Sequence, residues 1–229
     1  IAALESEIKE NKKPVSLYLE PTVTATADVV KTRVIAHNVV GLLEGSDPVL
    51  KNEYVIIGAH FDHLGLGGEG SGSRTPDQVA VHNGADDNAS GTAGVVELAQ
   101  KLSSNRLNLK RSFIFVAFTG EEMGLLGSKE FVNKPPVELT KVNTMINMDM
   151  IGRLNPETKT IIIGGTGTSA ESDSILKILE TGRPFKVSRS TDGYGPSDHA
   201  AFYSVNIPVF YFSTGAHDEY HTPADDSDK

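Results

Sequence analysis

Five side chains of the kind that bind divalent metal ions stand in short, motif-like contexts: His60 in GAHFDH, Asp87 in GADDNASG, Glu122 in TGEEMGLLGS, Asp149 in NMDMIG and His221 in EYHTPADD. Zinc accepts imidazole nitrogen and carboxylate oxygen as ligands, and so do other divalent ions. Two histidines and three acids suffice for two zinc ions that share a bridging carboxylate. Two metals about 3.5–4 Å apart can activate water and clamp the oxygens of a hydrolysis. The pattern therefore predicts a metallohydrolase with two zinc ions.

Each of these residues also has an ordinary structural interpretation. A single histidine at a strand end is usually hydrogen-bonded or at the surface, and we interpret the loop residues His63 and His82 in this way. Acidic pairs are usually solvated, because an ionised carboxylate is costly to bury unpaired. However, Glu121 and Glu122 follow the apolar run FIFVAF, and Asp149 closes the run MINMD. We therefore expect these acids at the ends of buried strands, where they need a cation.

Two neighbouring acids suit supporting roles. Asp62 stands two residues after His60, and a carboxylate that accepts the second ring N–H of a metal-bound imidazole orients that imidazole. Glu121 directly precedes Glu122, so one of them can bind metal while the other faces the bound water as a general base. Such a base takes a proton from water and passes it to a leaving amine. This is the chemistry of peptide-bond hydrolysis.

The five motifs, in this order between about Asn38 and His221, resemble those of the bacterial leucyl aminopeptidase-type twin-zinc exopeptidases. Relatives of that family include glutamate carboxypeptidase II and the single-zinc glutaminyl cyclases. The resemblance implies that the five motif residues named above are the ligands, with Asp87 as the bridging carboxylate. It also implies that Glu121 is the general base and that the substrates are peptides, cleaved by an aminopeptidase.

The resemblance also indicates which of the adjacent residues Asp86 and Asp87 is the carboxylate shared by the two metal ions. Counted back from Ser90-Gly91, the family's bridging residue falls on Asp87. In that family a cis peptide bond follows the bridging residue, and here this is the bond Asp87-Asn88. We therefore expect a cis bond at this position.

A tyrosine is implied near the last ligand. The segment DGYGPSDHA resembles the family's turn in which a tyrosine assists the developing oxyanion, and this maps to Tyr194. The alternative is that Tyr194 is simply a core or surface residue. We expect Asp198 and His199 to support this turn rather than to bind metal. Candidates for the specificity pocket are Met150, Tyr194 and Phe210.

Three kinds of function remain to be compared, and an aminopeptidase is favoured. The same fold could act as a carboxypeptidase on acidic C-termini, as an amidohydrolase or as a glutaminyl cyclase. The cyclases use one zinc, whereas both ligand sets are intact here. A carboxypeptidase should show an arginine cluster around its pocket, and Arg74, Arg153, Arg183 and Arg189 are too scattered along the chain to decide this point. A receptor-like, non-enzymatic module would have lost its ligands, and intact ligands together with Glu121 oppose it.

Apolar spacing indicates the elements of the first part of the chain. The segment IAALESEIKENKK has helical spacing, and SLYLE and TVTATADVV have the alternation of edge strands. Residues 1–37 are therefore expected to form a lead-in helix and edge strands. The β-rich runs RVIAHNVVGLLEG and YVIIGAH are separated by the turn-like GSDP, which predicts an antiparallel pair.

From Ser90 onward, helices and strands alternate. The pattern predicts a helix from Ser90, the strand FIFVAF, a helix around 125–132, strands near 145–149 and at TIIIGG, a helix over 172–179 and the strand PVFYF. Alternation of this kind predicts an α/β fold with a mixed, mostly parallel sheet and helices on both faces. We expect one three-layer α/β/α domain over residues 1–229, which the resemblance identifies as a phosphorylase/hydrolase-like zinc exopeptidase fold. Ligands of such sheets bind beyond the carboxyl ends of the strands, where the strand order reverses.

Composition excludes several partners. The 229 residues include 21 basic and 30 acidic side chains, a net charge of −9, and no basic tract, so nucleic acid and anionic membranes are poor partners. The sequence contains no run of about 18 apolar residues, so it predicts no membrane span. The glycine-rich stretch 64–83 lacks the Lys-Ser/Thr of a phosphate loop, so we do not expect a nucleotide site there.

The cellular compartment follows only from the resemblance. The chain has no cysteine, which fits cytosolic and exported proteins equally. The resemblance favours export, to the periplasm, the medium or the cell surface. The sequence begins at Ile1 without a recognisable signal peptide, and it ends with ADDSDK where relatives continue into a final helix. We expect an upstream domain and this helix to be missing from the sequence.

Overall fold

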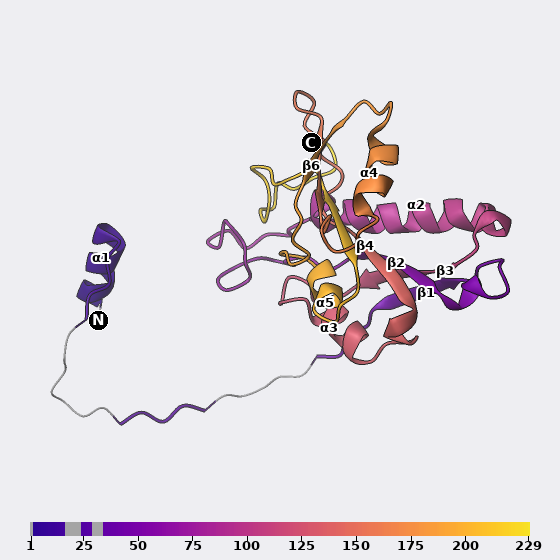
Figure 1. Cartoon of the computed structure of the whole chain (residues 1–229). Coiled ribbons are helices and arrows are strands. Elements are labelled where there is room, and N and C mark those ends of the chain that lie inside the picture. The colour runs from indigo at the N-terminus through magenta and orange to yellow at the C-terminus, as the bar shows by residue number, and fades with distance from the viewer. Residues whose placement is uncertain (1, 17–23, 29–33) are drawn as a thin grey trace. The chain divides into compact units, whose positions relative to one another are not determined.

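The computed structural model describes residues 2–16, 24–28 and 34–229, which fall into two compact units divided after Ile35. The first unit contains helix α1 (Ala2–Asn11), as its helical spacing predicted (Figure 1). Residues 24–28, expected in an edge strand, have no regular structure. Most of the segment SLYLE, the other expected edge strand, lies outside the described residues. The second unit, from Ala36 to Lys229, contains all five ligand motifs.

The second unit is built on a seven-stranded sheet with the order β1-β3-β2-β4-β7-β5-β6. Its strands are β1 (Val39–Leu43), β2 (Tyr54–His60), β3 (Ser112–Phe118), β4 (Val142–Met148), β5 (Thr160–Gly164), β6 (Lys186–Arg189) and β7 (Val209–Ser213). Its α-helices are α2 (Gly91–Ser104), α3 (Leu126–Asn133), α4 (Ser172–Glu180) and α5 (His199–Tyr203). Short helical turns are η1 (Leu50–Asn52), η2 (Ala85–Ser90), η3 (Arg106–Asn108) and η4 (Leu139–Lys141).

The elements expected from Ser90 onward are present. Strand β6 and helix α5, of four and five residues, were not expected, because elements this short show too few apolar repeats. None of the helices in the described residues is long and apolar enough to cross a membrane.

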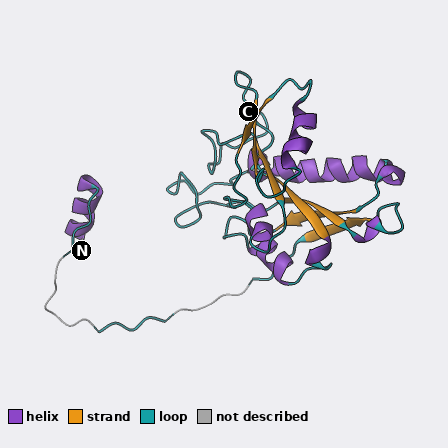
Figure 2. Cartoon of the chain, in the orientation of Figure 1, coloured by secondary structure: helices purple, strands orange, loops and turns teal. Residues whose placement is uncertain are grey.

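Helices cover both faces of the sheet (Figure 2). Successive side chains of a strand point to opposite faces, so Ile56 and Ile57 of β2 enter different apolar clusters. Ile57 packs with Val95 of α2, and the same face carries α4 further along the sheet. Ile56 packs with Phe131 of α3 and Phe202 of α5. The predicted three-layer α/β/α fold is therefore confirmed.

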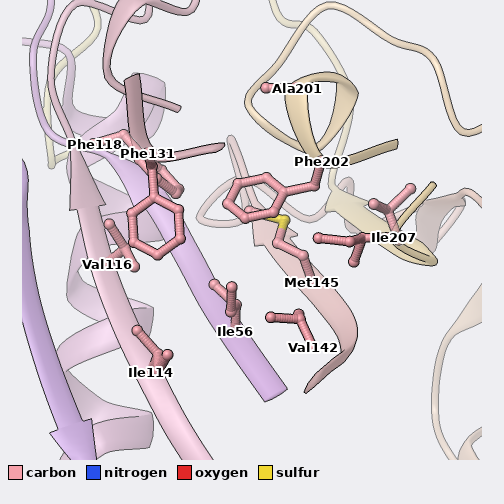
Figure 3. Close-up of a cluster of buried hydrophobic side chains, with 11 residues drawn as sticks. Ile56, Ile114, Val116, Phe118, Phe131, Val142, Met145, Ala201, Phe202 and Ile207 are labelled. Carbon is pink, nitrogen blue, oxygen red and sulfur yellow. The ribbon is translucent and has the colours of Figure 1, made fainter. Parts of the chain in front are cut away.

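The apolar cluster beneath α3 and α5 is the larger buried core (Figure 3). Three aromatic rings lie at its centre, with centroid distances of 6.0 Å for Phe118 and Phe131, 5.9 Å for Phe118 and Phe202, and 5.5 Å for Phe131 and Phe202. Tilted and edge-on aromatic pairs at such distances each contribute about 0.5–1.5 kcal/mol beyond the area that they bury. The cluster holds α3 and α5 firmly against the central strands.

The expected antiparallel pairing of the first two strands is wrong. Strand β1 pairs antiparallel with β3, and β3 lies between β1 and β2. The link between β1 and β2 is not a tight hairpin, because it includes the helical turn η1 (Leu50–Asn52). Strand β2 is largely buried and occupies a central place, whereas β1 is mostly exposed and lies at the edge. The apolar runs were recognised correctly, but their neighbours in the sheet were not.

Strand directions bring the motif residues together. Strands β3, β2, β4 and β7 are parallel neighbours, so their carboxyl ends share one edge of the sheet. From β2 the chain moves to β3 on one side and then returns to β4 on the other side. Such a reversal opens a crevice at the carboxyl ends, because the connecting segments leave in opposite directions. This is the expected place for the site.

Candidate metal centre

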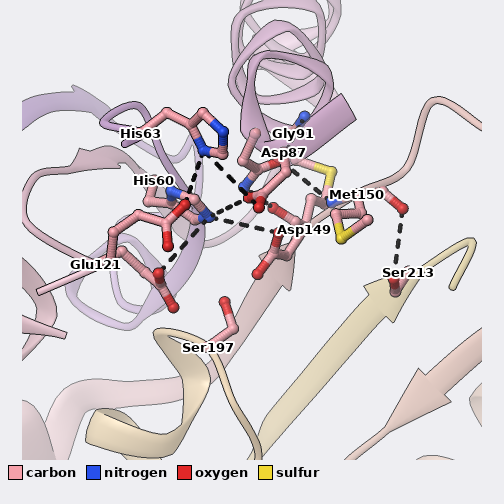
Figure 4. Close-up of polar contacts among 12 residues, drawn as sticks. His60, His63, Asp87, Gly91, Glu121, Asp149, Met150, Ser197 and Ser213 are labelled. Carbon is pink, nitrogen blue, oxygen red and sulfur yellow. Dashed lines mark hydrogen bonds and ion pairs between the residues drawn. The ribbon is translucent and has the colours of Figure 1, made fainter. Parts of the chain in front are cut away.

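Three ligand motifs lie where the central strands end (Figure 4). His60 is the last residue of β2, Asp149 directly follows β4, and Glu121 and Glu122 follow β3 after two intervening residues. His60 is 1% exposed and Asp149 is 8% exposed. Apolar strand patterns thus carry ionisable side chains into a buried position, as the sequence predicted.

The other two expected ligands come from loops. Asp87 lies in the irregular turn η2 that leads into α2, and His221 lies in the C-terminal loop with φ of +57°. The peptide bond Asp87-Asn88 is cis, which confirms that prediction. The structure brings both residues to the strand ends, where they join His60, Glu122 and Asp149. We call these five side chains the ligand cluster.

The two oxygens of Asp87 face two different histidines. Oδ1 lies 3.3 Å from Nε2 of His60, and Oδ2 lies 3.2 Å from Nε2 of His221. Each histidine also meets a second acid: Asp149 Oδ1 lies 3.5 Å from His60 Nε2, and Glu122 Oε2 lies 3.2 Å from His221 Nε2. Asp87 therefore joins two groups, each made of one histidine and two carboxylates, as a bridging ligand must.

These distances fit metal ions. Two ligand atoms at about 2.0–2.1 Å from one tetrahedral zinc ion lie about 3.3–3.4 Å apart. The histidine–carboxylate distances of both groups are close to this spacing and longer than a usual charged hydrogen bond of about 2.7–2.9 Å. Asp149 Oδ1 is also buried without a hydrogen-bond partner among the described residues. The residues present therefore fit a pair of zinc ions, one in each group.

The charge of the cluster also indicates cations. Burial opposes the protonation of His60, but the carboxylates of Asp149 and Asp87 outweigh burial and raise its pKa to about 12. Burial likewise opposes the protonation of His221, and Asp87 and Glu122 raise its pKa to about 10. In the protein without metal, protons on these imidazoles balance the buried carboxylates. Bound metal ions would replace those protons.

Glu121 lies beside the ligand cluster and points toward it. Its Oε2 is 4.0 Å from Nε2 of His60, and its side chain is 9% exposed. Burial raises the pKa of Glu121 to about 8, and the carboxylates of Asp198 and Asp149 add to this rise. A carboxylate whose pKa lies near neutral pH can both accept and return a proton, which is what a general base needs.

Asp62 does not orient His60 in the predicted way. Its carboxylate lies 3.9 Å from Nδ1 of His60, too far for a hydrogen bond, whereas its backbone carbonyl oxygen lies 3.1 Å from that nitrogen. The carboxylate instead accepts the backbone N–H of Glu121 at 3.1 Å. The close spacing in sequence lets the backbone reach the imidazole first, so the side chain is free to hold the turn that carries Glu121.

The predicted position of Tyr194 is also corrected. Its side chain is 61% exposed and packs against Tyr203, with ring centroids 4.7 Å apart. It does not line the cavity at the ligand cluster, whereas Tyr211 and Tyr220 do. The turn DGYGPSDHA brings Pro196 to the cavity wall but directs the tyrosine outward. Asp198 and His199 are buried at the start of α5. Their support of the turn stays a prediction, because the carboxylate of Asp198 and Nδ1 of His199 have no hydrogen-bond partner among the described residues.

A cavity of about 290 Å³ opens onto the ligand cluster. Its other walls are Glu121, Met150, Ile162, Tyr211, Ser213, Gly215, Ala216, Tyr220 and Pro196. Of the candidates for a specificity pocket, Met150 lines this cavity. Phe210 instead packs with Ile163 and Leu176 in the apolar cluster beneath α4, so it is a core residue.

A buried network ties the turn that carries Asp87 to two other loops. The carboxylate of Asp225, which is fully buried, accepts the backbone N–H of Asp86 at 3.1 Å and that of Asp87 at 3.0 Å. It also accepts a bond from Nη2 of Arg153 at 2.8 Å. In turn, Oδ1 of Asp86 accepts the N–H of Gly152 at 2.7 Å. The loop after β4 and the loop that carries the motif EYHTPADD therefore hold Asp87 in place.

Three residues of the site were missed at the level of sequence. His63 was interpreted as an ordinary loop histidine, but its Nδ1 lies 2.8 Å from Oε1 of Glu122. Asp225 stands in the quoted motif EYHTPADD, so an acid close to a ligand was the available signal. Arg153 was counted among scattered arginines, and no local pattern marks its partner.

Comparisons with known proteins find a matching family and several relatives. Residues 38–229 match the profile of peptidase family M28. Leupeptin-inactivating enzyme 1 of Streptomyces exfoliatus is 31% identical over 181 residues, which are 79% of this chain and 36% of that protein. A probable leucine aminopeptidase 2 of Arthroderma benhamiae is 32% identical over 191 residues, covering 78% of this chain and 34% of that protein. The chain thus spans about a third of the length of these relatives.

A solved structure of a zinc aminopeptidase has a similar fold. The zinc aminopeptidase BSAP of Bacillus subtilis has a TM-score of 0.63 and 26% identity to this chain. The similarity covers 82% of this chain and 44% of that chain.

Proposed function

This chain belongs to peptidase family M28, and from this and the geometry of the ligand cluster we propose that it is a metal-dependent aminopeptidase with two zinc ions. The observation that carries the proposal is the position of Asp87, whose two oxygens face His60 and His221 at 3.3 and 3.2 Å. Glu121 lies beside them as the proposed general base. The zinc aminopeptidase and leucine aminopeptidase among its relatives support the choice of metal and reaction.

The metal ions and the side chains of the site would have different roles in hydrolysis. Bound zinc ions would supply a water molecule of lowered pKa and would polarise the scissile carbonyl group. Glu121 takes the proton of the attacking water and delivers it to the leaving amine. Burial raises the pKa of Glu121, which favours its holding the proton between the two steps. Asp62 holds the backbone N–H of Glu121, so it keeps the base at the mouth of the cluster.

The cavity fits the amino-terminal end of a peptide. A free amino terminus is either an ammonium cation or a neutral amine. The carboxylates of the cluster attract the cation by their charge and can accept hydrogen bonds from the N–H groups of either form. Met150, Ile162 and Tyr211 offer mainly apolar surface beside these carboxylates. We assign this wall to the side chain of the first peptide residue. A cavity of about 290 Å³ leaves room for one side chain and the first peptide bond.

The proposed activity is tested with a panel of peptides in free and N-acetylated forms. The zinc-loaded protein is incubated with each peptide, with and without a chelator, and the products are followed by mass spectrometry. Chelator-sensitive loss of single residues from free amino termini alone is expected. Trimming from the C-terminus, formation of pyroglutamate or no reaction would instead indicate a carboxypeptidase, a cyclase or a non-peptide substrate.

We also propose that the protein is exported, as the family resemblance of its sequence implies. Fractionation of cells that express the native gene, with an antibody against the chain, should detect it in the periplasm, at the surface or in the medium. Detection in the cytosol alone would contradict this assignment.

A further inference from the structure

His63 stands next to the ligand cluster without belonging to the expected set. It lies in the loop after β2, and its side chain is only 8% exposed. Nδ1 lies 2.8 Å from Oε1 of Glu122 and 3.8 Å from Oδ2 of Asp87. The ligand atoms of His63, Asp87 and Glu122 fall within 4.8 Å of one another, close enough to suggest that His63 is a metal ligand. Figure 4 shows His63 beside Asp87.

The distances from His63 to its neighbouring carboxylates differ from those of His60 and His221. His60 and His221 lie 3.2–3.5 Å from their carboxylates, the spacing of atoms that share an ion. His63 approaches Glu122 to 2.8 Å, which is a hydrogen-bond distance and shorter than the roughly 3.3 Å between ligands of one tetrahedral zinc. Its distance to Asp87, 3.8 Å, is longer than that spacing. His63 therefore contacts a ligand directly, and the position expected for an ion lies elsewhere.

The two oxygens of Glu122 have different partners. Oε1 meets Nδ1 of His63, and Oε2 meets Nε2 of His221 at 3.2 Å. An ionised carboxylate only accepts hydrogen bonds, so the proton between His63 and Glu122 lies on Nδ1 of the imidazole. One oxygen of Glu122 is thereby occupied, and the other remains directed toward the group that contains His221.

Packing holds the ring of His63 in this position. Gly84 has φ of +60°, and a Cβ atom there would lie 2.7 Å from Cγ of His63. The backbone at Gly84 therefore lies directly against the imidazole. The rings of His82 and His221 flank it, with centroids 6.4 and 5.7 Å away. A ring enclosed on several sides can fix the direction of its hydrogen bond.

We propose that His63 is a positioning residue that donates a hydrogen bond from Nδ1 to Glu122 and makes this carboxylate bind metal through its other oxygen only. The proposal rests on the metal pair of the proposed function. Hydrogen bonds to ligating groups orient them, and losing one typically weakens metal affinity or activity about 10–100-fold. His63 thus performs for Glu122 the orienting role that the sequence suggested for Asp62 at His60.

Two substitutions distinguish a hydrogen-bond donor from a ligand. Asparagine can place a side-chain N–H near the position of Nδ1 in histidine, but its neutral amide nitrogen does not bind zinc. Zinc affinity is measured on the full chain by competition with a chromophoric chelator. His63→Ala should weaken the binding of one of two zinc ions about 10–100-fold, and His63→Asn should restore most of the loss. The cobalt(II)-loaded His63→Asn protein should keep the visible spectrum of wild-type protein, because no ligand has changed.

His82→Ala is the matched control, since it removes a neighbouring buried imidazole that bonds Ser73 and Ala80 instead of a ligand. Because the His82 ring flanks His63 but bonds no ligand, the zinc affinity of this variant should fall far less than that of His63→Ala. If His63→Asn binds zinc as weakly as His63→Ala and both change the cobalt spectrum, His63 is a ligand and the proposal is wrong. Wild-type affinity in His63→Ala would also overturn it. Wild-type protein that binds fewer than two zinc ions would refute the metal pair itself, independently of His63.

Discussion

The same central strands build an apolar core and an ionisable site, and both are deeply buried. In β2, Ile56 is 0% exposed and packs in the apolar cluster beneath α3 and α5, whereas His60 is 1% exposed in the ligand cluster. In β4, Met145 is 0% exposed, and Asp149, just beyond the strand, is 8% exposed. The degree of burial therefore does not distinguish the two regions. The difference lies in what each buried group requires from its surroundings.

An apolar side chain is stabilised simply by leaving water, at roughly 25 cal/mol per Å² of apolar surface. A buried carboxylate is destabilised by the same transfer unless a cation or hydrogen bonds compensate. The apolar cluster is therefore stable without any further partner, whereas the buried carboxylates of the ligand cluster need metal ions or protons to compensate their charge. Substitutions in the first region should change the free energy of unfolding, and those in the second should change catalysis or metal binding.

The largest effect is expected for Glu121→Gln. Because glutamine cannot accept the proton of the attacking water, kcat should fall about 10²–10⁴-fold. The zinc content and the free energy of unfolding should stay near wild type, since Glu121 is not in the ligand cluster. Steady-state kinetics, metal analysis and urea denaturation measure the three quantities. A variant with the wild-type kcat would show that another group is the base.

Phe202→Ala tests the apolar cluster beneath α3 and α5. It removes a fully buried ring that contacts Phe118 and Phe131, and should lower the free energy of unfolding by about 3–5 kcal/mol. Urea denaturation measures this loss. Folded protein should still bind two zinc ions, because the ring does not line the metal cavity. A large drop in zinc affinity without a loss of stability would mean that the two regions are not separable in this way.

Arg153→Ala tests a link between stability and metal binding. Arg153 pairs with the buried Asp225, which holds the backbone of Asp87. Without this partner the turn should loosen, and zinc affinity should fall about 10–100-fold. Competition with a chelator measures the change. Glu219→Gln is the control, because it removes the more exposed partner of the same arginine and should leave zinc affinity unchanged. Equal losses in both variants would mean that the effect is not specific to the pair of Arg153 and Asp225.

The smallest effect is expected for Ile56→Val in the apolar cluster. Removing one buried methylene should lower the free energy of unfolding by about 0.5–1.5 kcal/mol. Neither kcat nor zinc affinity should change, although Ile56 lies in the same strand as His60. Urea denaturation and steady-state kinetics provide the measurements. A reduced kcat would reveal that packing along β2 adjusts the position of the imidazole.

Particular residues show how far sequence reasoning extends. Apolar runs that end in a ligand predicted correctly that His60 and Asp149 lie at strand ends, because strand periodicity and termination are local. The pairing of β1 was wrong because the choice of a strand's neighbour depends on the whole sheet. Asp62 and Tyr194 were given roles from their spacing and resemblance, but spacing does not determine where a side chain points. His63 was set aside because its partner, Glu122, is distant in sequence.

The sequence by itself determined the chemistry available to this protein: two histidines and three acids of the kinds that bind zinc, a second acid beside Glu122 and the strands that carry most of them. These are properties of residue type and local pattern. Only the tertiary structure decided that the two oxygens of Asp87 face His60 and His221, that Asp225 holds the turn of Asp87, and that His63 reaches Glu122. Such contacts depend on strand order and loop packing, which bring residues distant in sequence to within a few ångströms.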